Sequence, residues 1–280
     1  MNPWGWATET GIDDSGLWAG FETGAARQVM RWISPGTFLM GSPESEPGRH
    51  DGEILHNVTL TTGFWLAETA CSQELWEAVM KENPGHFQRG GDYPIEGVSW
   101  TDCQKFTKRL GQFLPDLEVT LPTEAQWEYA CRAGSDTAFY WGGELSPDQA
   151  NYDYQSSNDD RVRPQRSDGT QPVHSFQPNP WGLYQMHGNV WEWCQDRLGA
   201  YSPEPVIDPV GPVSGQQRVL RGGSWFSDGR SLRSAYRAPA PDFRSNFFGF
   251  RLAGGSALPV RASSADRPVR STEEIEGKRK

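Results

Sequence analysis

The chain has 280 residues and a net charge of −10 at pH 7, with 13 tryptophans, 31 glycines and 21 prolines. This acidic balance argues against a general nucleic-acid or anionic-membrane binder, so neither partner is expected. The glycine and proline content predicts many turns and long irregular connections rather than a helical bundle.

The sequence shows no targeting or membrane signal. The N-terminus "MNPWGWATETGIDDSG" has no basic segment followed by an apolar one, and no apolar run is long enough to span a bilayer. We therefore expect a cytoplasmic protein. Cys71, Cys103, Cys131 and Cys194 are widely separated and lack zinc or redox spacing, so we expect small buried apolar residues.

The first elements are predicted to be strands. Residues 1–25 have weak structure signals and are treated as an N-terminal segment. Residues 27–42 contain two β-rich runs around the turn dipeptide Pro35-Gly36, which predicts a hairpin. After a polar loop, "VTLTTGFWLAETACS" (residues 58–72) predicts a second strand pair.

Three helices have recognisable starts. Ser72 can cap "QELWEAVMKEN", and "SWTDCQKFTKRLGQFLP" has apolar residues at helical spacing before its proline. In "LPTEAQWEYACRAG", Thr123 and Gln126 form a capping box, and Gly134 is placed as the C-cap.

Short strands and loops should fill residues 135–215, and the last strands are "RVLRGGSW", "LRSAYRA" and "FGFRLA". The polar tail 254–280 has no periodicity, so we expect it to be disordered. One α+β domain over residues 26–253 is the best interpretation. Its core should hold Trp65, Trp76, Trp100, Trp127, Trp191 and Trp193; an aromatic sugar-binding site is the alternative.

Five motifs occur in a fixed order: "GTFLMGS", "LPTEAQWEYACRAG", "NPWGLYQMHGNVWEWCQD", "RVLRGGSW" and "GFRL". Together they resemble the formylglycine-generating enzyme (sulfatase-modifying factor) family, over about residues 27–253. The resemblance implies a single C-type-lectin-like domain with few helices, short antiparallel strands and much irregular chain.

The catalytic residues of that family are not matched. Its enzymes bind copper with two cysteines shortly after a Gly-Gly-Ser-aromatic motif, which here ends at Trp225. Ser227 stands where the first cysteine would be, the second would fall near Gly229 or Leu232, and no cysteine follows Cys194. Cu(I) prefers soft thiolate ligands. We therefore expect no copper, no catalytic residue here and no formylglycine activity.

A related sulfoxide-synthase branch uses a histidine-ligated iron. The histidines of this chain are dispersed, so that chemistry is not expected: they are His50, His56, His86, His174 and His187.

The segment after the Gly-Gly-Ser-Trp motif also resembles the variable proteins of diversity-generating retroelements. In those proteins selected codons are rewritten between fixed framing residues. The resemblance implies a ligand-binding surface at Phe226, Ser227, Asp228, Ser231, Tyr236, Ala238, Ala240, Phe243, Ser245, Phe247 and Phe248. Exposed aromatic rings would form an apolar patch that marks a binding site. The alternative is that these rings belong to the core of the last strands.

The resemblance also implies a Ca²⁺ site at Gln185, Gly188, Val190 and Glu192. Carboxylate and carbonyl oxygens suit Ca²⁺. The alternative for Glu192 is a buried carboxylate held by an arginine or by backbone N–H groups. A second implied site would begin at Asn151 and Tyr152, with its acidic partner in the loop that contains Asp159, Asp160 and Asp168.

We predict a monomeric, non-catalytic ligand-binding protein with a variable binding surface. Its ligand should be a protein or another macromolecule, because the surface is broad and has no grouped acid–base or nucleophilic residues. One alternative is a formylglycine-generating-enzyme-like oxidoreductase that modifies sulfatases. The other is a structural accessory domain of a larger complex.

Overall fold

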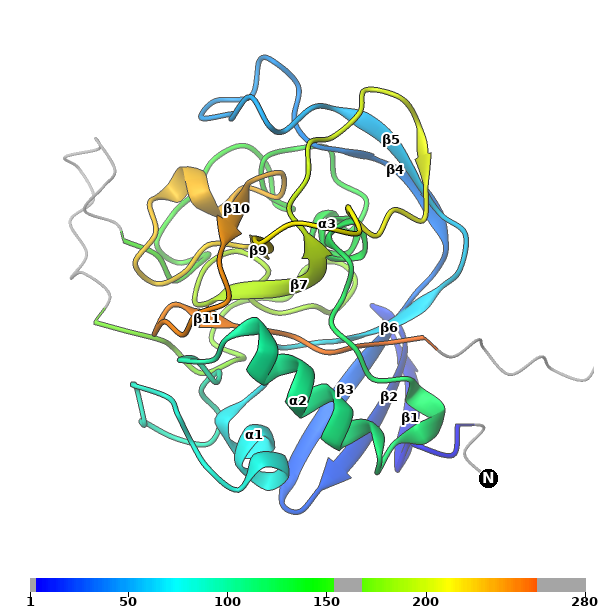
Figure 1. Ribbon diagram of the computed structural model, residues 1–280, viewed down its shortest axis with the longest axis vertical. Helices are drawn as coiled ribbons and strands as arrows, with labels where there is room; N and C mark the ends of the chain where they lie inside the picture. The colour runs from blue at the N-terminus through cyan, green and yellow to red at the C-terminus, as the bar shows by residue number, and fades with distance from the viewer. Residues whose placement is uncertain (1–3, 154–167, 256–280) are drawn as a thin grey trace, which may run out of the picture.

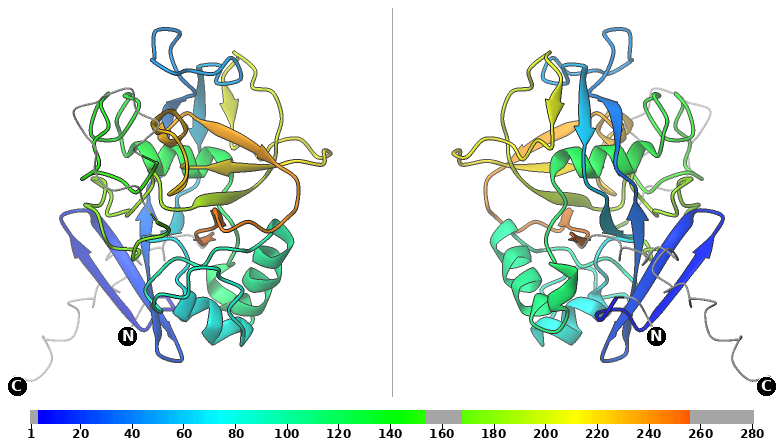
Figure 2. Two further views of the ribbon diagram at one scale, coloured as in Figure 1. Left: turned by 90° about the vertical axis from the view of Figure 1, so that its left-hand side faces the viewer. Right: turned by 90° about the vertical axis from the view of Figure 1, so that its right-hand side faces the viewer.

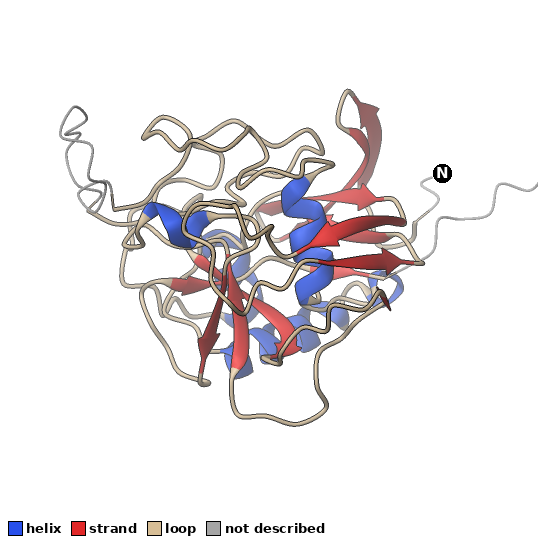
Figure 3. Ribbon diagram, turned by 90° about the horizontal axis from the view of Figure 1, so that it is seen from above, coloured by secondary structure: helices blue, strands red, loops and turns tan. Residues whose placement is uncertain are grey.

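The computed structural model describes residues 4–153 and 168–255 (Figure 1). Within these residues, three sheets and three α-helices are joined by long irregular segments, which Figure 3 shows in tan. The domain is therefore α+β with much irregular chain, as predicted. Within the described ranges, no helix has the length and apolarity to cross a membrane.

The largest sheet has five strands in the order β1-β2-β3-β6-β12, and every neighbouring pair is antiparallel. Its strands are β1 (Glu9–Asp13), β2 (Gly16–Thr23), β3 (Ala26–Ile33), β6 (Phe64–Ala67) and β12 (Ala253–Gly254). The β1–β2 hairpin projects from one side of the molecule (Figure 2). Beyond Gly255, the predicted tail lies outside the described residues.

Two smaller sheets complete the domain. One has the order β10-β9-β7-β11 and the other the order β4-β5-β8. Their strands are β7 (Trp191–Arg197), β9 (Arg218–Arg221), β10 (Arg237–Ala240), β11 (Phe248–Gly249), β4 (Gly36–Met40), β5 (His56–Leu60) and β8 (Val206–Ile207).

The predicted hairpin of residues 27–42 does not form, and the two strands found within residues 56–67 do not pair with each other. Strand β3 pairs with β6 up to Ile33 and Phe64, and β4 pairs with β5 from Gly36 and Leu60. Residues 26–40 and 56–67 are therefore one long antiparallel ladder that bends from the first sheet into the third. Pro35 lies at the bend, where its fixed φ and missing N–H interrupt the ladder without reversing the chain.

The sequence gives only weak structure signals before residue 26, yet this segment contains two strands. Strands β1 and β2 lie there and extend the five-stranded sheet. Trp4 and Trp6 are buried and pack edge-on against Trp65, with ring centroids 5.0 and 5.4 Å apart. The two large rings bury apolar surface that the small and polar residues of this segment do not provide.

The helices begin where the sequence predicts. Ser72 caps α1 (Gln73–Met80), Ser99 caps α2 (Trp100–Gly111), and Thr123 forms the predicted capping box of α3 (Glu124–Arg132). The C-cap of α3 is Ala133, with φ 45°, rather than Gly134. Short 3₁₀ helices in the described residues include η1 (Pro115–Leu117) and η3 (Gly229–Leu232).

Helices α1 and α2 lie beside one another and cover the five-stranded sheet (Figures 1 and 2). The main core between them holds Trp65, Trp76 and Trp193, and a second core surrounds Trp127 on α3. Trp100 and Trp191 are half-buried against the main core. All four cysteines are buried and free, which confirms their predicted role.

Candidate ligand-binding surface

The segment predicted to carry the surface is fixed at its start by two glycines. Gly222 and Gly223 have φ values of +91° and +76°, which side chains rarely adopt. A Cβ on Gly223 would also lie 2.6 Å from Leu232. After this turn, the backbone N–H of Trp225 donates to the Asn189 carbonyl at 2.9 Å. This bond fixes the position at which the segment begins.

Four arginines that frame this segment are structural, because each is held by a buried glutamate; we call these four the framing arginines. Their side chains and those of their partners are at most 8% exposed. The pairs are Arg221 with Glu128, Arg233 with Glu53 (2.7 Å), Arg237 with Glu124 (2.5 Å) and Arg251 with Glu192 (2.6 Å). Breaking one buried pair costs about 3–5 kcal/mol. The loops between these arginines are therefore anchored at several points.

Four aromatic rings lie together on these loops. Phe226 is 45% exposed; it stacks on Phe247 at 5.4 Å and meets Trp225 edge-on at 5.3 Å. Phe87 also meets Trp225 edge-on, with ring centroids 5.2 Å apart. We call Phe87, Trp225, Phe226 and Phe247 the aromatic surface. The sequence analysis did not include Phe87, which comes from a loop far away in the chain.

The predicted surface positions differ in how exposed they are. Phe226 and Phe243 are exposed, the latter by 46%. Half-buried positions are Ser227, Asp228, Ser231, Tyr236, Ala238, Ser245 and Phe247. Ala240 and Phe248 are buried in the main core, so assigning them to a surface is wrong. Phe248 is buried because β11 pairs with β7, which brings the Phe248 ring against Trp193, with ring centroids 5.2 Å apart.

Ser227, at the position of a family cysteine, has a simple structural environment. Its hydroxyl lies 3.0 Å from the Ser224 hydroxyl and accepts a hydrogen bond from the Ser224 N–H. Within residues 4–153 and 168–255, no acid or base contacts the Ser227 hydroxyl. Asp228 instead caps η3 and accepts from the Ser231 N–H and hydroxyl at 3.1 and 2.8 Å. A nucleophile needs a neighbouring base, and this serine has none in the described structure.

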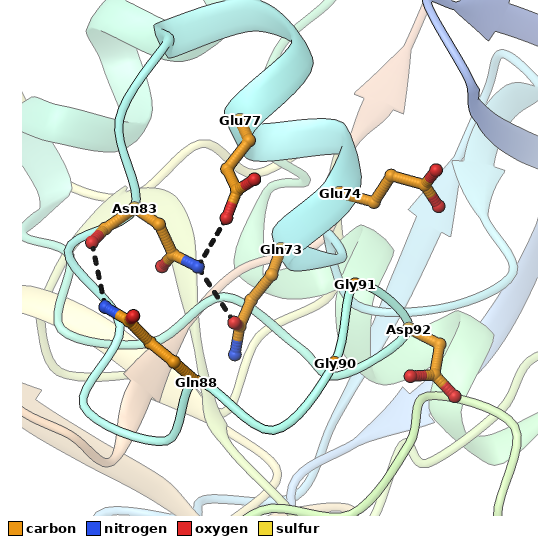
Figure 4. A pocket seen from close by; sticks show the side chains of 8 residues that line it. All are labelled: Gln73, Glu74, Glu77, Asn83, Gln88, Gly90, Gly91 and Asp92. Carbon is orange, nitrogen blue, oxygen red and sulfur yellow. Dashed lines mark hydrogen bonds between the residues drawn. The ribbon is translucent and has the colours of Figure 1, made fainter.

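A polar pocket of about 460 Å³ lies beside the start of α1 (Figure 4). It lies between α1 and the loop that carries Phe87, and is lined by Gln73, Glu74, Glu77, Asn83, Gln88, Gly90, Gly91 and Asp92. Asn83 points into the pocket and donates to Gln73 and Glu77 at 2.9 and 2.7 Å. These bonds hold the loop in place beside α1.

The described structure holds one buried group of potential nucleophiles. The Cys131 sulfur lies 3.7 Å from both His187 Nε2 and the Ser234 hydroxyl. Burial raises the pKa of Cys131 to about 12 and lowers that of His187 to about 4. Both groups are therefore neutral near pH 7, and a neutral buried thiol is a poor nucleophile.

The residues implied for the first Ca²⁺ site already have partners. Both carboxylate oxygens of Glu192 bind Arg251, at 2.6 and 2.8 Å, and one also accepts from Trp127. Gln185 accepts from Asn189 and donates to the Pro172 carbonyl. Val190 donates its N–H to the Gly188 carbonyl. With its only carboxylate paired to an arginine, this donor set does not fit Ca²⁺.

The residues implied for the second Ca²⁺ site also have partners or are buried. Asn151 donates to the Gly169 carbonyl and the Asn189 side chain, and Tyr152 is buried. Asp168 pairs with Arg89 at 2.9 Å, whereas Asp159 and Asp160 lie outside the described residues. In the described part of the chain, no group of three or more His, Cys, Asp or Glu side chains could hold a metal ion.

The sheets, capped helices and arginine-framed loops define a domain of the formylglycine-generating-enzyme type. A model of the sulfatase-modifying factor enzyme 1-like domain matches residues 21–255, and the chain belongs to this family. Two solved structures share the fold: Treponema denticola variable protein 1 and PvdO from Pseudomonas aeruginosa. Each has a TM-score of 0.73 and covers 85% of this chain and 98% of its own, at 26% and 27% identity.

Similar sequences include enzymes and one inactive homologue. The formylglycine-generating enzyme of Thermomonospora curvata is 38% identical over 220 residues, 71% of this chain and 67% of that enzyme. That of Streptomyces coelicolor is 36% identical over 183 residues, 60% and 54% of the two chains. Bos taurus inactive C-alpha-formylglycine-generating enzyme 2 is 32% identical over 177 residues, 60% and 52%. The chain thus spans about half to two thirds of these relatives.

Proposed function

We propose that this chain is a non-catalytic ligand-binding protein whose binding site is the aromatic surface with the adjoining Phe243 loop. The observation that carries the proposal is the exposure of Phe226 and Phe243, each by nearly half. Water-exposed aromatic rings on loops held by a rigid scaffold are typical of binding sites. The neutral, unactivated surroundings of Ser227 also favour binding over catalysis.

The ligand is a protein or another macromolecule, and the surface is of the kind that diversity-generating retroelements rewrite. The fold shared with Treponema denticola variable protein 1 supports this proposal. Its second support is the separation of roles along the chain. Buried arginine pairs hold the frame, while the exposed positions between them contribute little to the core.

Sequencing this gene in many isolates tests whether the surface varies. Substitutions should concentrate at the predicted positions that are not buried, whereas Ala240, Phe248 and the framing arginines stay constant. A reverse transcriptase gene and a near-repeat of this coding segment should lie nearby. Substitutions spread evenly over the domain, or concentrated at the buried positions, would contradict diversification.

Selection from a displayed library of random peptides tests binding itself. Peptides enriched on the full chain should bind Phe226→Ser roughly thirtyfold more weakly, because aromatic anchors contribute about 2 kcal/mol or more to binding. Phe113→Ser is the matched control, since Phe113 is 68% exposed at the end of α2. Failure to enrich any peptide, or equal losses for both variants, would count against this surface.

A formylglycine-generating-enzyme-like oxidoreductase is the second candidate. The 38% identity to the Thermomonospora curvata enzyme favours it, and Ser227 opposes it. The test is Cu(I) titration together with aldehyde formation on a cysteine peptide taken from a sulfatase. Copper binding at one equivalent with aldehyde product would replace our proposal with this one.

A further inference from the structure

A single buried asparagine joins the loops behind the aromatic surface. Asn189 is 1% exposed and has φ 70°, a left-handed conformation that asparagine tolerates better than most residues. Its backbone N–H donates to the Asn151 carbonyl at 2.8 Å, and its carbonyl accepts from Trp225 at 2.9 Å. The backbone of one residue therefore links the 151 loop to the base of the surface.

The side-chain amide of Asn189 binds the remaining loops. Its oxygen accepts from Asn151 Nδ2 at 3.1 Å and from the Gln171 N–H at 2.9 Å. Its nitrogen donates to the Gln171 carbonyl at 3.0 Å and to Gln185 Oε1 at 2.6 Å. Both donors and both acceptor positions of the amide are used, so the group is fully satisfied.

These contacts explain why the implied Ca²⁺ donor set does not fit. Gln185, which the family resemblance assigns as a ligand, gives its oxygen to an Asn189 N–H. Glu192, the only carboxylate of the set, is neutralised by Arg251. We infer that in this chain the hydrogen bond from the Asn189 amide to Gln185 takes the place of a bound cation, and that this amide fixes the loops that position Trp225. Asn189 is a positioning residue of the surface, whatever ligand the surface binds.

Asn189→Asp is the most informative change, because it keeps the shape and replaces the NH₂ donor by an oxygen. The Gln171 carbonyl and Gln185 Oε1 then face a carboxylate and lose their hydrogen bonds. Uncompensated oxygens of this kind are the ligands that Ca²⁺ prefers, and Ca²⁺ tolerates irregular geometry better than Mg²⁺ does. The variant should therefore acquire a requirement for calcium that the natural chain lacks.

Thermal melting of the full chain in EDTA, CaCl₂ and MgCl₂ tests the inference. The natural chain should melt at one temperature in all three. Asn189→Asp should melt roughly 5–15 °C lower in EDTA, because two buried hydrogen bonds are lost, and should recover in CaCl₂ more than in MgCl₂. Asn57→Asp, the same change at an exposed position, is the control and should not alter melting.

Each of the following results would overturn the inference. The natural chain could lose stability in EDTA and regain it with Ca²⁺, which would show a resident cation. The melting temperature of Asn189→Asp could equal that of the natural chain in EDTA, or it could be lower and not respond to Ca²⁺. Either result would show that the amide and a cation are not equivalent. If Asn189→Asp does not fold, Gln185→Leu should still lower the melting temperature equally in EDTA and CaCl₂, and a calcium-dependent loss would overturn the inference.

Discussion

Replacing Asp196 by asparagine should stabilise the protein, and increasingly so as the pH rises. Asp196 is a buried residue of β7, and its side chain accepts a hydrogen bond from the Glu124 N–H at 2.9 Å. Burial, with the neighbouring Glu124 carboxylate, raises the pKa of Asp196 to about 7. Asparagine keeps an oxygen for the Glu124 N–H and carries no charge.

The sign and size of this pH effect on stability follow from proton linkage. The ordinary pKa is 3.8, so between pH 4 and 7 the folded chain binds more protons at Asp196 than the unfolded chain. The stability that this proton provides is complete below the unfolded pKa and is lost as the pH rises through the folded pKa. At about 1.4 kcal/mol per pKa unit, the full loss is about 4 kcal/mol. About 2.5 kcal/mol of it falls between pH 5 and pH 8.

Urea unfolding of the natural chain and Asp196→Asn at several pH values measures this difference. The advantage of the variant should grow by about 2.5 kcal/mol from pH 5 to pH 8, whatever constant offset the substitution adds. Titrating groups that do not interact with Asp196 cancel, because both chains contain them. A difference that stays constant with pH, or one that shrinks as the pH rises, would refute the assignment of a raised pKa to Asp196.

Three further outcomes are expected. Arg251→Met should lower the free energy of unfolding by about 3–5 kcal/mol in urea titrations, because it leaves the buried Glu192 unpaired; a loss below about 1 kcal/mol would contradict this. Phe226→Ser should cost less than about 1 kcal/mol, whereas the fully buried Phe250→Ala should cost about 3–5 kcal/mol; equal losses would show that the Phe226 ring belongs to the core. Ser227→Cys should not bind Cu(I) at one equivalent, because no second cysteine lies in that segment; tight binding in a chelator competition would disprove it.

Local signals in the sequence predicted the helices well, because a helix start depends on residues three or four apart. Ser72 and Thr123 cap their helices as expected, and each bond is made within one turn. The same holds for the motif glycines, whose positive φ values are local properties of the turn. Family resemblance supplied the fold, since five ordered motifs constrain it more than composition does.

Strand pairing and the full surface could not be predicted in this way. The partner of Ile33 is Phe64, with strands β4 and β5 and their connecting loop between the two. Alternation along one strand says nothing about the identity of its partner. Phe87 joins the aromatic surface from a loop whose sequence carries no pattern pointing to Trp225. The burial of Phe248 likewise depends on its pairing with β7, which no local pattern encodes.

The arrangement of buried and exposed residues explains how one segment can hold both a rigid frame and a changeable surface. The buried Arg–Glu pairs and Asn189 fix the backbone through groups that do not include the side chains of Phe226 or Phe243. Substitutions at exposed positions usually alter stability by about 0.5 kcal/mol or less, so the surface can change while the frame remains folded. Catalysis would impose the opposite constraint, because a reaction needs particular groups at fixed positions. The separation of frame from surface therefore supports the proposed binding function rather than a catalytic one.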